Sequence, residues 1–275
     1  MRLLAIVVML LCSTAAAAPE DAWLDDLSNR VVTDLADGKP LVVRVHVPLC
    51  DNTIIPCGNA KLGDGDNPET NLYWATTPGF GRWFARKGSG WKKTRATAET
   101  GDADVLLVHE YERVVATPAA WREAGAPAKT TVRLVIQAWR GSAIDRALAA
   151  YANDLSTGTA PIVAWVGHNR LMDVDTFAWP APAEATTGAI AIACHTAAYM
   201  EKAVPAATRV PLLMTRDFLF ANAAPLEAAV LAFATGGDYA RIRREAATAY
   251  AGVRKREVRH VAGAFTNPAD RRWGR

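Results

Sequence analysis

Long hydrophobic runs are scarce in this 275-residue sequence. The amino terminus carries one, Leu3 to Leu11, and no later stretch reaches the roughly 18 apolar residues of a membrane-spanning helix. A clustered excess of basic residues is also missing, because the net charge is only +3 and Lys and Arg are scattered along the chain. These absences argue against a membrane span in the mature protein and against nucleic acid as a partner.

Several motifs of catalysis and nucleotide binding are absent as well. The sequence has no G-x-S-x-G elbow, no Walker A loop, no G-x-G-x-x-G after the first predicted strand and no H-E-x-x-H. The five histidines are dispersed, and no Cys/His pair has the spacing of zinc ligands. Asp64, Asp66 and Glu69 place oxygen ligands close together but lack the closing glutamate of an EF-hand, and we interpret them as a turn without metal. We therefore expect no metal and no organic cofactor.

The amino-terminal segment has the pattern of a secretory signal peptide. Arg2 precedes the apolar run, and small residues at 15–18 follow it, which suits cleavage near Ala18. We therefore predict a signal peptide over residues 1–18 and a single α/β domain over residues 19–275. The mature protein is expected to be periplasmic or secreted.

Cysteine is also scarce, and its few positions are informative. With Cys12 in the signal peptide, the mature chain keeps Cys50, Cys57 and Cys194. In an oxidising compartment, Cys50 and Cys57 are the natural disulfide pair, because only a short turn-like segment separates them. Cys194 is then an unpaired thiol, which is either a reactive group or a small buried apolar side chain.

Short apolar runs alternate with helical patterns along the rest of the chain. They predict an α/β fold with a mostly parallel six-stranded sheet flanked by helices. The predicted strands are 41–49, 105–115, 131–139, 161–166, 188–193 and 209–215. Predicted helices include 20–37, 71–84, 143–155, 224–234 and 238–256, whereas 87–101 is expected to be an exposed loop and the tail from Gly263 to be loosely held.

Two of these strands end on reactive side chains. Pro161 to Val166 runs into Gly167-His168-Asn169, and Gly188 to Ala193 runs into Cys194-His195-Thr196. If the two strands are parallel neighbours, His168 and Cys194 lie at the same carboxyl edge, where open α/β sheets place their sites. A thiol beside an imidazole is the minimal pair of nucleophile and base. Backbone N–H groups of the strand-to-helix turn at which Cys194 stands are candidates to stabilise an oxyanion. His195 is a rival base, but adjacent side chains of an extended segment point to opposite sides, which favours His168.

The same residues resemble the caspase-like (clan CD) cysteine peptidases. In that superfamily a strand ending in a Gly/His dipeptide precedes a strand ending in Ala-Cys, here Val166 to Asn169 and Ile192 to Cys194. The resemblance implies a mostly parallel six-stranded sheet and a His168/Cys194 catalytic dyad that cleaves a peptide or protein substrate. Asn169 takes the place of the usual glycine after the histidine, where the family contributes to the oxyanion site. Four further motifs, at 49–52, 62–65, 71–74 and 167–173, resemble a family of exported bacterial proteins that implies no activity.

Asp173 and Asp217 follow strands at this same edge and are candidates for a specificity pocket that receives a basic side chain. Each is also interpretable as a turn or capping aspartate. His46 lies inside the first predicted strand, and we interpret it as a structural histidine.

The sequence therefore supports two hypotheses. The first is an exported cysteine hydrolase, a peptidase, that uses His168 and Cys194 through a thioester intermediate. The second is a non-catalytic exported binding protein on a caspase-like scaffold, with a buried Cys194 and a site formed by the same sheet edge and the Asp-rich loop of residues 59–69.

Overall fold

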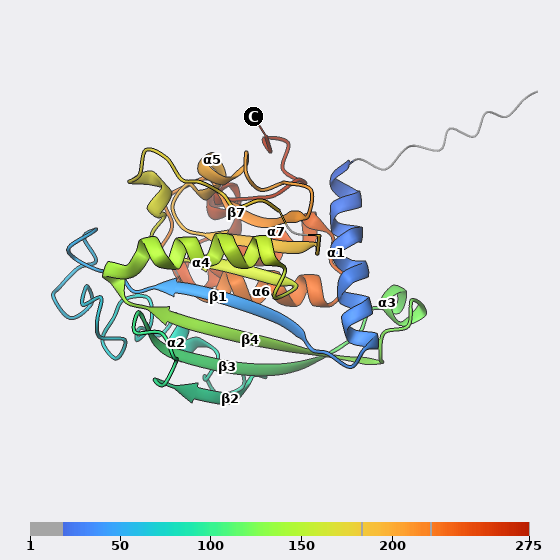
Figure 1. Ribbon diagram of the computed structural model, residues 1–275, viewed down its shortest axis with the longest axis horizontal. Helices are drawn as coiled ribbons and strands as arrows, with labels where there is room; N and C mark the ends of the chain where they lie inside the picture. Colours follow the sequence, from blue (N-terminus) through green and yellow to red (C-terminus); the bar gives the residue numbers. More distant parts are fainter. Residues whose placement is uncertain (1–18, 183, 221, 275) are drawn as a thin grey trace, which may run out of the picture.

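Eight strands form one mixed sheet through the middle of the molecule (Figure 1), in the order β2-β3-β4-β1-β5-β6-β7-β8. The computed structural model describes residues 19–182, 184–220 and 222–274. The strands are β1 (Leu41–Pro48), β2 (Lys92–Thr97), β3 (Val105–Ala116), β4 (Lys129–Trp139), β5 (Ile162–Val166), β6 (Thr187–Ile192), β7 (Arg209–Thr215) and β8 (Phe265–Thr266). The helices are α1 (Pro19–Ala36), α2 (Phe80–Trp83), α3 (Ala119–Glu123), α4 (Ile144–Thr157), α5 (Thr196–Met200), α6 (Ala224–Ala234), α7 (Tyr239–Arg254) and α8 (Val258–Val261), with 3-10 turns at Gly141–Ala143, Arg170–Met172 and Ala262–Ala264.

The inner part of the sheet is parallel, as the continuous apolar runs predict. Strand β1 pairs in parallel with β4 and β5, and β5, β6 and β7 continue the parallel series. The pairs β2/β3, β3/β4 and β7/β8 are antiparallel. All six predicted strands are confirmed, and the α/β class with them, but the predicted number of six is wrong because the sheet has eight.

The two missed strands are short edge strands without a hydrophobic signal. β2 reads KKTRAT and is exposed along most of its length, so it has no apolar alternation, and residues 87–101 are not simply a loop. β8 is two residues long and lies in the tail that was expected to be loosely held. That tail is instead anchored: Phe265 is fully buried, and the amide of Asn267 donates to the carbonyls of Leu212 and Tyr239.

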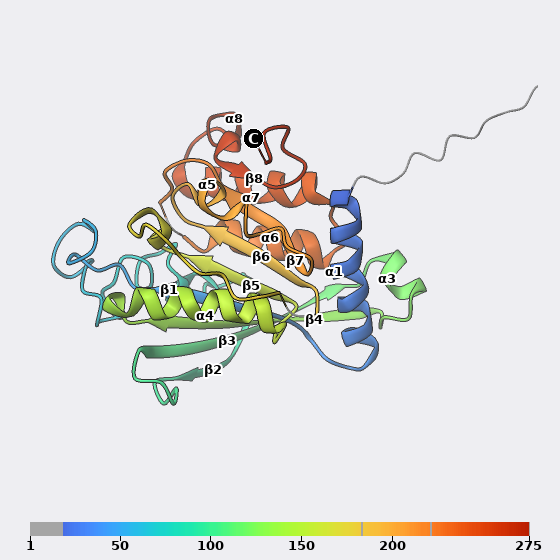
Figure 2. The same ribbon diagram turned by 45° about the horizontal axis from the view of Figure 1, so that its top comes forward.

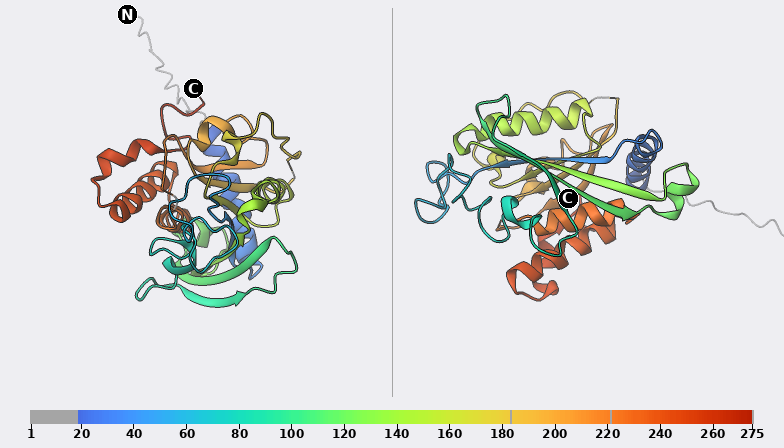
Figure 3. Two further views of the ribbon diagram at one scale, coloured as in Figure 1. Left: turned by 90° about the vertical axis from the view of Figure 1, so that its left-hand side faces the viewer. Right: turned by 90° about the horizontal axis from the view of Figure 1, so that it is seen from below.

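Helices cover both faces of the sheet (Figures 2 and 3). On one face, α4 packs Ala147, Leu148 and Tyr151 against Val163 and Trp165 of β5. The opposite face of the strands packs against side chains of α1, α6 and α7. Because alternate strand residues point to opposite faces, both faces of β5 and β6 are buried, which explains their continuous apolar sequences.

The predicted helix over 71–84 is wrong, since only Phe80–Trp83 is helical and residues before it form turns. Pro78 interrupts the pattern, and the chain folds back onto Trp74 at Gly79. A Cβ on Gly79 would lie 2.7 Å from the Trp74 carbonyl oxygen, so only glycine permits this approach. The fold places Trp74 in the core beside the β2–β3 hairpin rather than on a helix face.

The predicted disulfide is confirmed: Cys50 and Cys57 are bonded, with their Cα atoms 6.0 Å apart. Such bonds are typical of oxidising compartments. The predicted signal peptide lies outside the described residues. Among the helices of the described part of the chain, none is both long and apolar enough to cross a membrane.

Candidate functional site

Strands β5 and β6 are parallel neighbours, as the sequence predicts. Their register pairs Ile162 with Gly188 and ends with Val166 opposite Ile192. The N–H of Gly167 still donates to the Ile192 carbonyl at 3.3 Å, one residue beyond the last pair. His168 and Cys194 each come two residues after that pair, so they leave the sheet at the same level of its carboxyl edge.

Gly167 makes the turn that carries His168 away from β5. Its φ of +145° is a backbone conformation that side-chain-bearing residues rarely adopt. A Cβ there would also lie 3.3 Å from the Pro48 carbonyl oxygen and 3.5 Å from the ring of Tyr73. Glycine is therefore required before the histidine, and this explains the Gly167-His168-Asn169 order in structural terms.

The His168 ring is held by Asp173. The Nε2 atom lies 2.5 Å from Asp173 Oδ2, while the carbonyl of His168 accepts a hydrogen bond from the indole of Trp165 at 3.0 Å. The imidazole side chain is 12% exposed, so its other nitrogen is not sealed in the core. Which nitrogen carries the proton depends on the tautomer, and the Asp173 contact favours the one with a proton on Nε2.

Asp173 is placed by a short chain of ion pairs. Arg170 lies 3.4 Å from Asp173 and also binds Asp145 of α4 at 2.7 Å. The 3-10 turn Arg170–Met172 brings Asp173 back towards the imidazole five residues earlier. Asp173 was expected only as a specificity or turn residue, so its contact with His168 is what sequence reasoning missed.

Cys194 is a free, partly exposed thiol at the end of β6. Its Sγ points towards the Leu219 carbonyl, at 3.8 Å. Burial and, to a smaller extent, the neighbouring Cys194 raise the pKa of the Tyr73 phenol well above its usual value, which places Tyr73 near Cys194. Tyr73 belongs to the 71–74 motif, and no sequence pattern linked that motif to the thiol.

Asn169 ties the two loops together. Its side-chain amide donates to the Cys194 carbonyl at 2.8 Å, and its Oδ1 accepts from the Leu171 N–H at 3.3 Å. The residue is fully buried. The structure thus gives the Asn169 side chain a positional role between the His168 and Cys194 loops, and the expected contribution to an oxyanion site stays a prediction for its backbone.

Two N–H groups of the turn after Cys194 are engaged by other parts of the chain, and an oxyanion role for this turn stays a prediction. His195 adopts φ +50°, and its N–H donates to the Asp217 carbonyl at 3.2 Å. The N–H of Thr196 approaches the Thr215 hydroxyl at 3.4 Å. These partners come from the end of β7 and from the segment after it.

The same segment carries Asp217 and Phe218. The Asp217 carboxylate is exposed and accepts the N–H of Phe218 at 2.8 Å, which is a local turn contact. Phe218 is 70% exposed and packs edge-on against the His195 ring, with centroids 4.5 Å apart. His195 therefore faces Phe218, and a basic-side-chain pocket at Asp173 and Asp217 stays a prediction.

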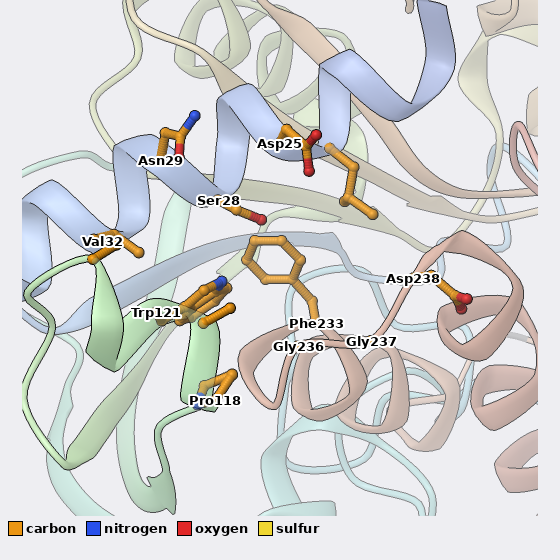
Figure 4. A pocket seen from close by; sticks show the side chains of 13 residues that line it. Asp25, Ser28, Asn29, Val32, Pro118, Trp121, Phe233, Gly236, Gly237 and Asp238 are labelled. Atoms are coloured by element: carbon orange, nitrogen blue, oxygen red, sulfur yellow. The ribbon is translucent and has the colours of Figure 1, made fainter. Parts of the chain in front are cut away.

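A cavity of about 490 Å³ lies at the other end of the sheet (Figure 4). It is lined by α1, α3 and the α6–α7 turn, with Trp121 and Phe233 in its wall and Asp25 and Asp238 at its sides. Neither His168 nor Cys194 lines it. Within the described residues no group of three or more His, Cys, Asp or Glu side chains is placed to hold a metal ion, and this includes the Asp64–Glu69 segment.

Comparisons with protein-family models, with curated proteins and with solved structures find no match to this chain. The residues and their geometry are therefore the basis for assigning a function.

Proposed function

We propose that this protein is an exported cysteine hydrolase, a peptidase, that cleaves a peptide or amide bond through a thioester on Cys194. One observation carries the proposal. A free, partly exposed thiol and an imidazole held by a carboxylate follow neighbouring parallel strands at the same level of the carboxyl edge. Activated cysteine nucleophiles have this arrangement, in which a base takes the thiol proton and a third group orients the base.

The proposed reaction uses His168 twice. The imidazole takes the Sγ proton as the thiolate attacks the carbonyl carbon, and the imidazolium then gives that proton to the leaving amine as the C–N bond breaks. Water, deprotonated by His168, hydrolyses the thioester and regenerates the thiol. Asp173, on Nε2, keeps the ring oriented and stabilises the imidazolium between these steps.

Turnover also requires a change at the segment after β7. The Asp217 carbonyl occupies the His195 N–H, which is a candidate donor to the oxyanion, and the Leu219 carbonyl faces the thiol. Movement of residues 217–219 would release both groups. The high exposure of Phe218 suits a segment that moves when a substrate binds.

Two further observations support the proposal. The Cys50–Cys57 disulfide suits an exported protein, in agreement with the amino-terminal pattern. The mostly parallel sheet, with the His-bearing strand before the Cys-bearing strand in the chain, suits the resemblance to caspase-like peptidases.

The test combines chemical reactivity with turnover. Native protein is treated with iodoacetamide at pH 7, the modified residue is identified by mass spectrometry, and a peptide-substrate library is screened with wild type and Cys194→Ala. We expect modification of Cys194 and a turnover that Cys194→Ala abolishes while its melting temperature is unchanged. A thiol that reacts only in urea would refute the hydrolase.

The competing proposal is a binding protein on the same scaffold. The observation that favours it is the engagement of both the Cys194 thiol and the His195 N–H by the 217–219 segment. It predicts no turnover of any library member, and a ligand-dependent rise in melting temperature that Cys194→Ala retains.

A further inference from the structure

A second, smaller cavity lies between the turns of residues 68–82 and the β2–β3 hairpin. Its volume is about 270 Å³, slightly below the roughly 300–1,000 Å³ of typical ligand pockets, so it suits only a small ligand. Trp74 and His109 line it, together with the charged side chains of Glu69, Arg82 and Lys93. Trp74 belongs to the 71–74 motif that the proposed hydrolase reaction leaves unexplained.

The hairpin presents two of these side chains to the cavity. In the antiparallel register Lys93 lies opposite Tyr111, and His109 is two residues from Tyr111, so these side chains share one face. The Lys93 ammonium lies 5.4 Å from the centre of the Tyr111 ring. Both lining residues therefore approach the cavity from the hairpin side.

His109 is a buried polar group with spare hydrogen-bonding capacity. It is nine-tenths buried and packs on Trp74, with ring centroids 5.0 Å apart. Within the described residues its one hydrogen-bond contact is the Tyr111 hydroxyl, 3.5 Å from Nδ1, so Nε2 has no protein partner there. Burial and the nearby charge of Lys93 lower the pKa of His109 to about 4, so the ring is neutral at pH 7 and offers one N–H donor.

The charges around the ring favour an anion. Neither Lys93 nor Arg82 forms an ion pair with any described residue, and both are exposed residues that line the cavity. A metal cation is disfavoured here, because an ammonium stands beside the only imidazole. Glu69 raises the pKa of Lys93 and offsets one of the two positive charges, so the cavity suits one negative charge better than two.

We propose that this cavity binds a small organic carboxylate. Lys93 and Arg82 supply the charge, His109 Nε2–H donates a hydrogen bond to the carboxylate, and the Trp74 ring provides an apolar wall for the rest of the ligand. This site is distinct from the Cys194 edge, and its existence does not depend on hydrolase activity.

The test is a titration of the full mature chain with benzoate at constant ionic strength and pH 7, followed by calorimetry and by the ring C–H resonances of His109 in NMR spectra. Saturable binding with a shift of the His109 signal is expected. Lys93→Met should raise Kd about tenfold, since a charge-assisted contact to the carboxylate is lost. Lys92→Met is the matched control, because it removes the same charge from the neighbouring exposed residue of β2 and lines no part of the cavity; its Kd should stay within about twofold.

Two results would overturn the proposal. One is benzoate binding that Lys92→Met and Lys93→Met weaken equally, which would mark a diffuse charge effect. The other is the failure of wild type to show saturable binding accompanied by a shift of the His109 signal. A further variant, His109→Gln, changes a buried residue. It is therefore included only if its melting curve matches that of wild type; if it does not, the test depends on Lys93→Met alone. Inorganic phosphate, as a dianion, should bind more weakly than benzoate.

Discussion

Two histidine–aspartate pairs lie on the parallel part of this sheet, and they have the same bonding but different surroundings. His46 Nε2 lies 3.0 Å from Asp154 Oδ2, and His168 Nε2 lies 2.5 Å from Asp173 Oδ2. His46 sits within β1, is 1% exposed and is enclosed by Trp139 and Tyr151. His168 sits beyond the end of β5, 12% exposed, on the loop that Asn169 ties to Cys194.

The difference shows that a carboxylate-oriented imidazole is not by itself a catalytic site. Inside β1 the His46–Asp154 contact satisfies polar groups that are buried in the core. Arg44 also contacts Asp154, at 3.2 Å. Beyond the strand end the same kind of pair is partly exposed, and the neighbouring parallel strand ends next to the free thiol of Cys194. Position relative to the carboxyl edge of the sheet, rather than the contact, separates the structural pair from the proposed catalytic one.

The largest expected effect comes from breaking the inner pair. Asp154→Ala removes the partner of His46 and Arg44 and should lower the free energy of unfolding by about 3 kcal/mol, the lower end for a broken buried ion pair because Arg44 is partly exposed. Urea denaturation followed by circular dichroism measures it. The rate of Cys194 alkylation should not change in the folded variant.

The matched control for that variant is on the same helix. Asp145→Ala removes an exposed carboxylate of α4 that pairs with Arg170, and surface pairs contribute only about 0–1 kcal/mol. Equal losses in the two variants would mean that the inner pair is not a stabilising unit. A loss of Cys194 reactivity in Asp154→Ala would mean that the two pairs are not independent.

Breaking the outer pair should affect chemistry and leave stability almost unchanged. Asp173→Asn keeps the shape but cannot stabilise the imidazolium, so we expect kcat on a cleaved library substrate to fall about 10- to 100-fold with KM unchanged. Asp173 acts through His168 as a positioning residue, so the pH profile of kcat should also shift, and Asp173→Glu should recover part of the rate.

Asp175→Asn is the control for this prediction, because Asp175 is an exposed carboxylate two residues further along the same connection. It should retain wild-type kinetics. Equal effects of the two substitutions, or a raised KM with kcat unchanged in Asp173→Asn, would instead indicate that Asp173 contacts the substrate, as expected for a specificity pocket.

Much of the fold could be predicted because its strands are buried on both faces. The apolar runs that end at Val166 and Ala193 predicted β5 and β6. The expectation that these two strands are parallel neighbours is confirmed. The edge strand β2 gave no signal, because exposed backbone pairing needs no apolar pattern. The helix predicted from periodicity over 71–84 is wrong, because the geometry of the turns at 71–79 depends on tertiary contacts of Gly79 with Trp74.

Only two residues of the candidate site could be predicted from the sequence. His168 and Cys194 were predicted because each follows the end of an apolar strand, and because the pairing of Cys50 with Cys57 leaves Cys194 as an unpaired thiol. The Asp173 contact depends on a 3-10 turn, and the blocked His195 N–H depends on the segment after β7, so both are three-dimensional facts. Asn169 illustrates the limit: the sequence marks its position, whereas the buried amide bonded to the Cys194 carbonyl emerges only from the fold.

The smallest expected effect is the pH dependence of stability that the inner pair contributes. Burial lowers the pKa of His46, so below about pH 6.5 the unfolded chain binds a proton that the folded chain does not. Stability is therefore complete above that pH and falls as pH decreases towards the folded pKa, by at most about 1.4 kcal/mol per pH unit. Burial alone would raise the pKa of Asp154, but the His46 hydrogen bond and Arg44 lower it, so its contribution is lost only at more acidic pH, below about 3.8.

Urea unfolding at pH 7, 6 and 5 measures this slope. His109, whose pKa is lowered to about 4, adds a slope of the same sign, so the comparison is made in a His109→Gln background. There His46→Asn should lower stability at pH 7 and flatten the dependence between pH 6.5 and 5, because no neutral buried imidazole remains to be excluded from protonation. An unchanged slope in that double variant would show that the acid sensitivity arises elsewhere in the chain and not from the inner pair.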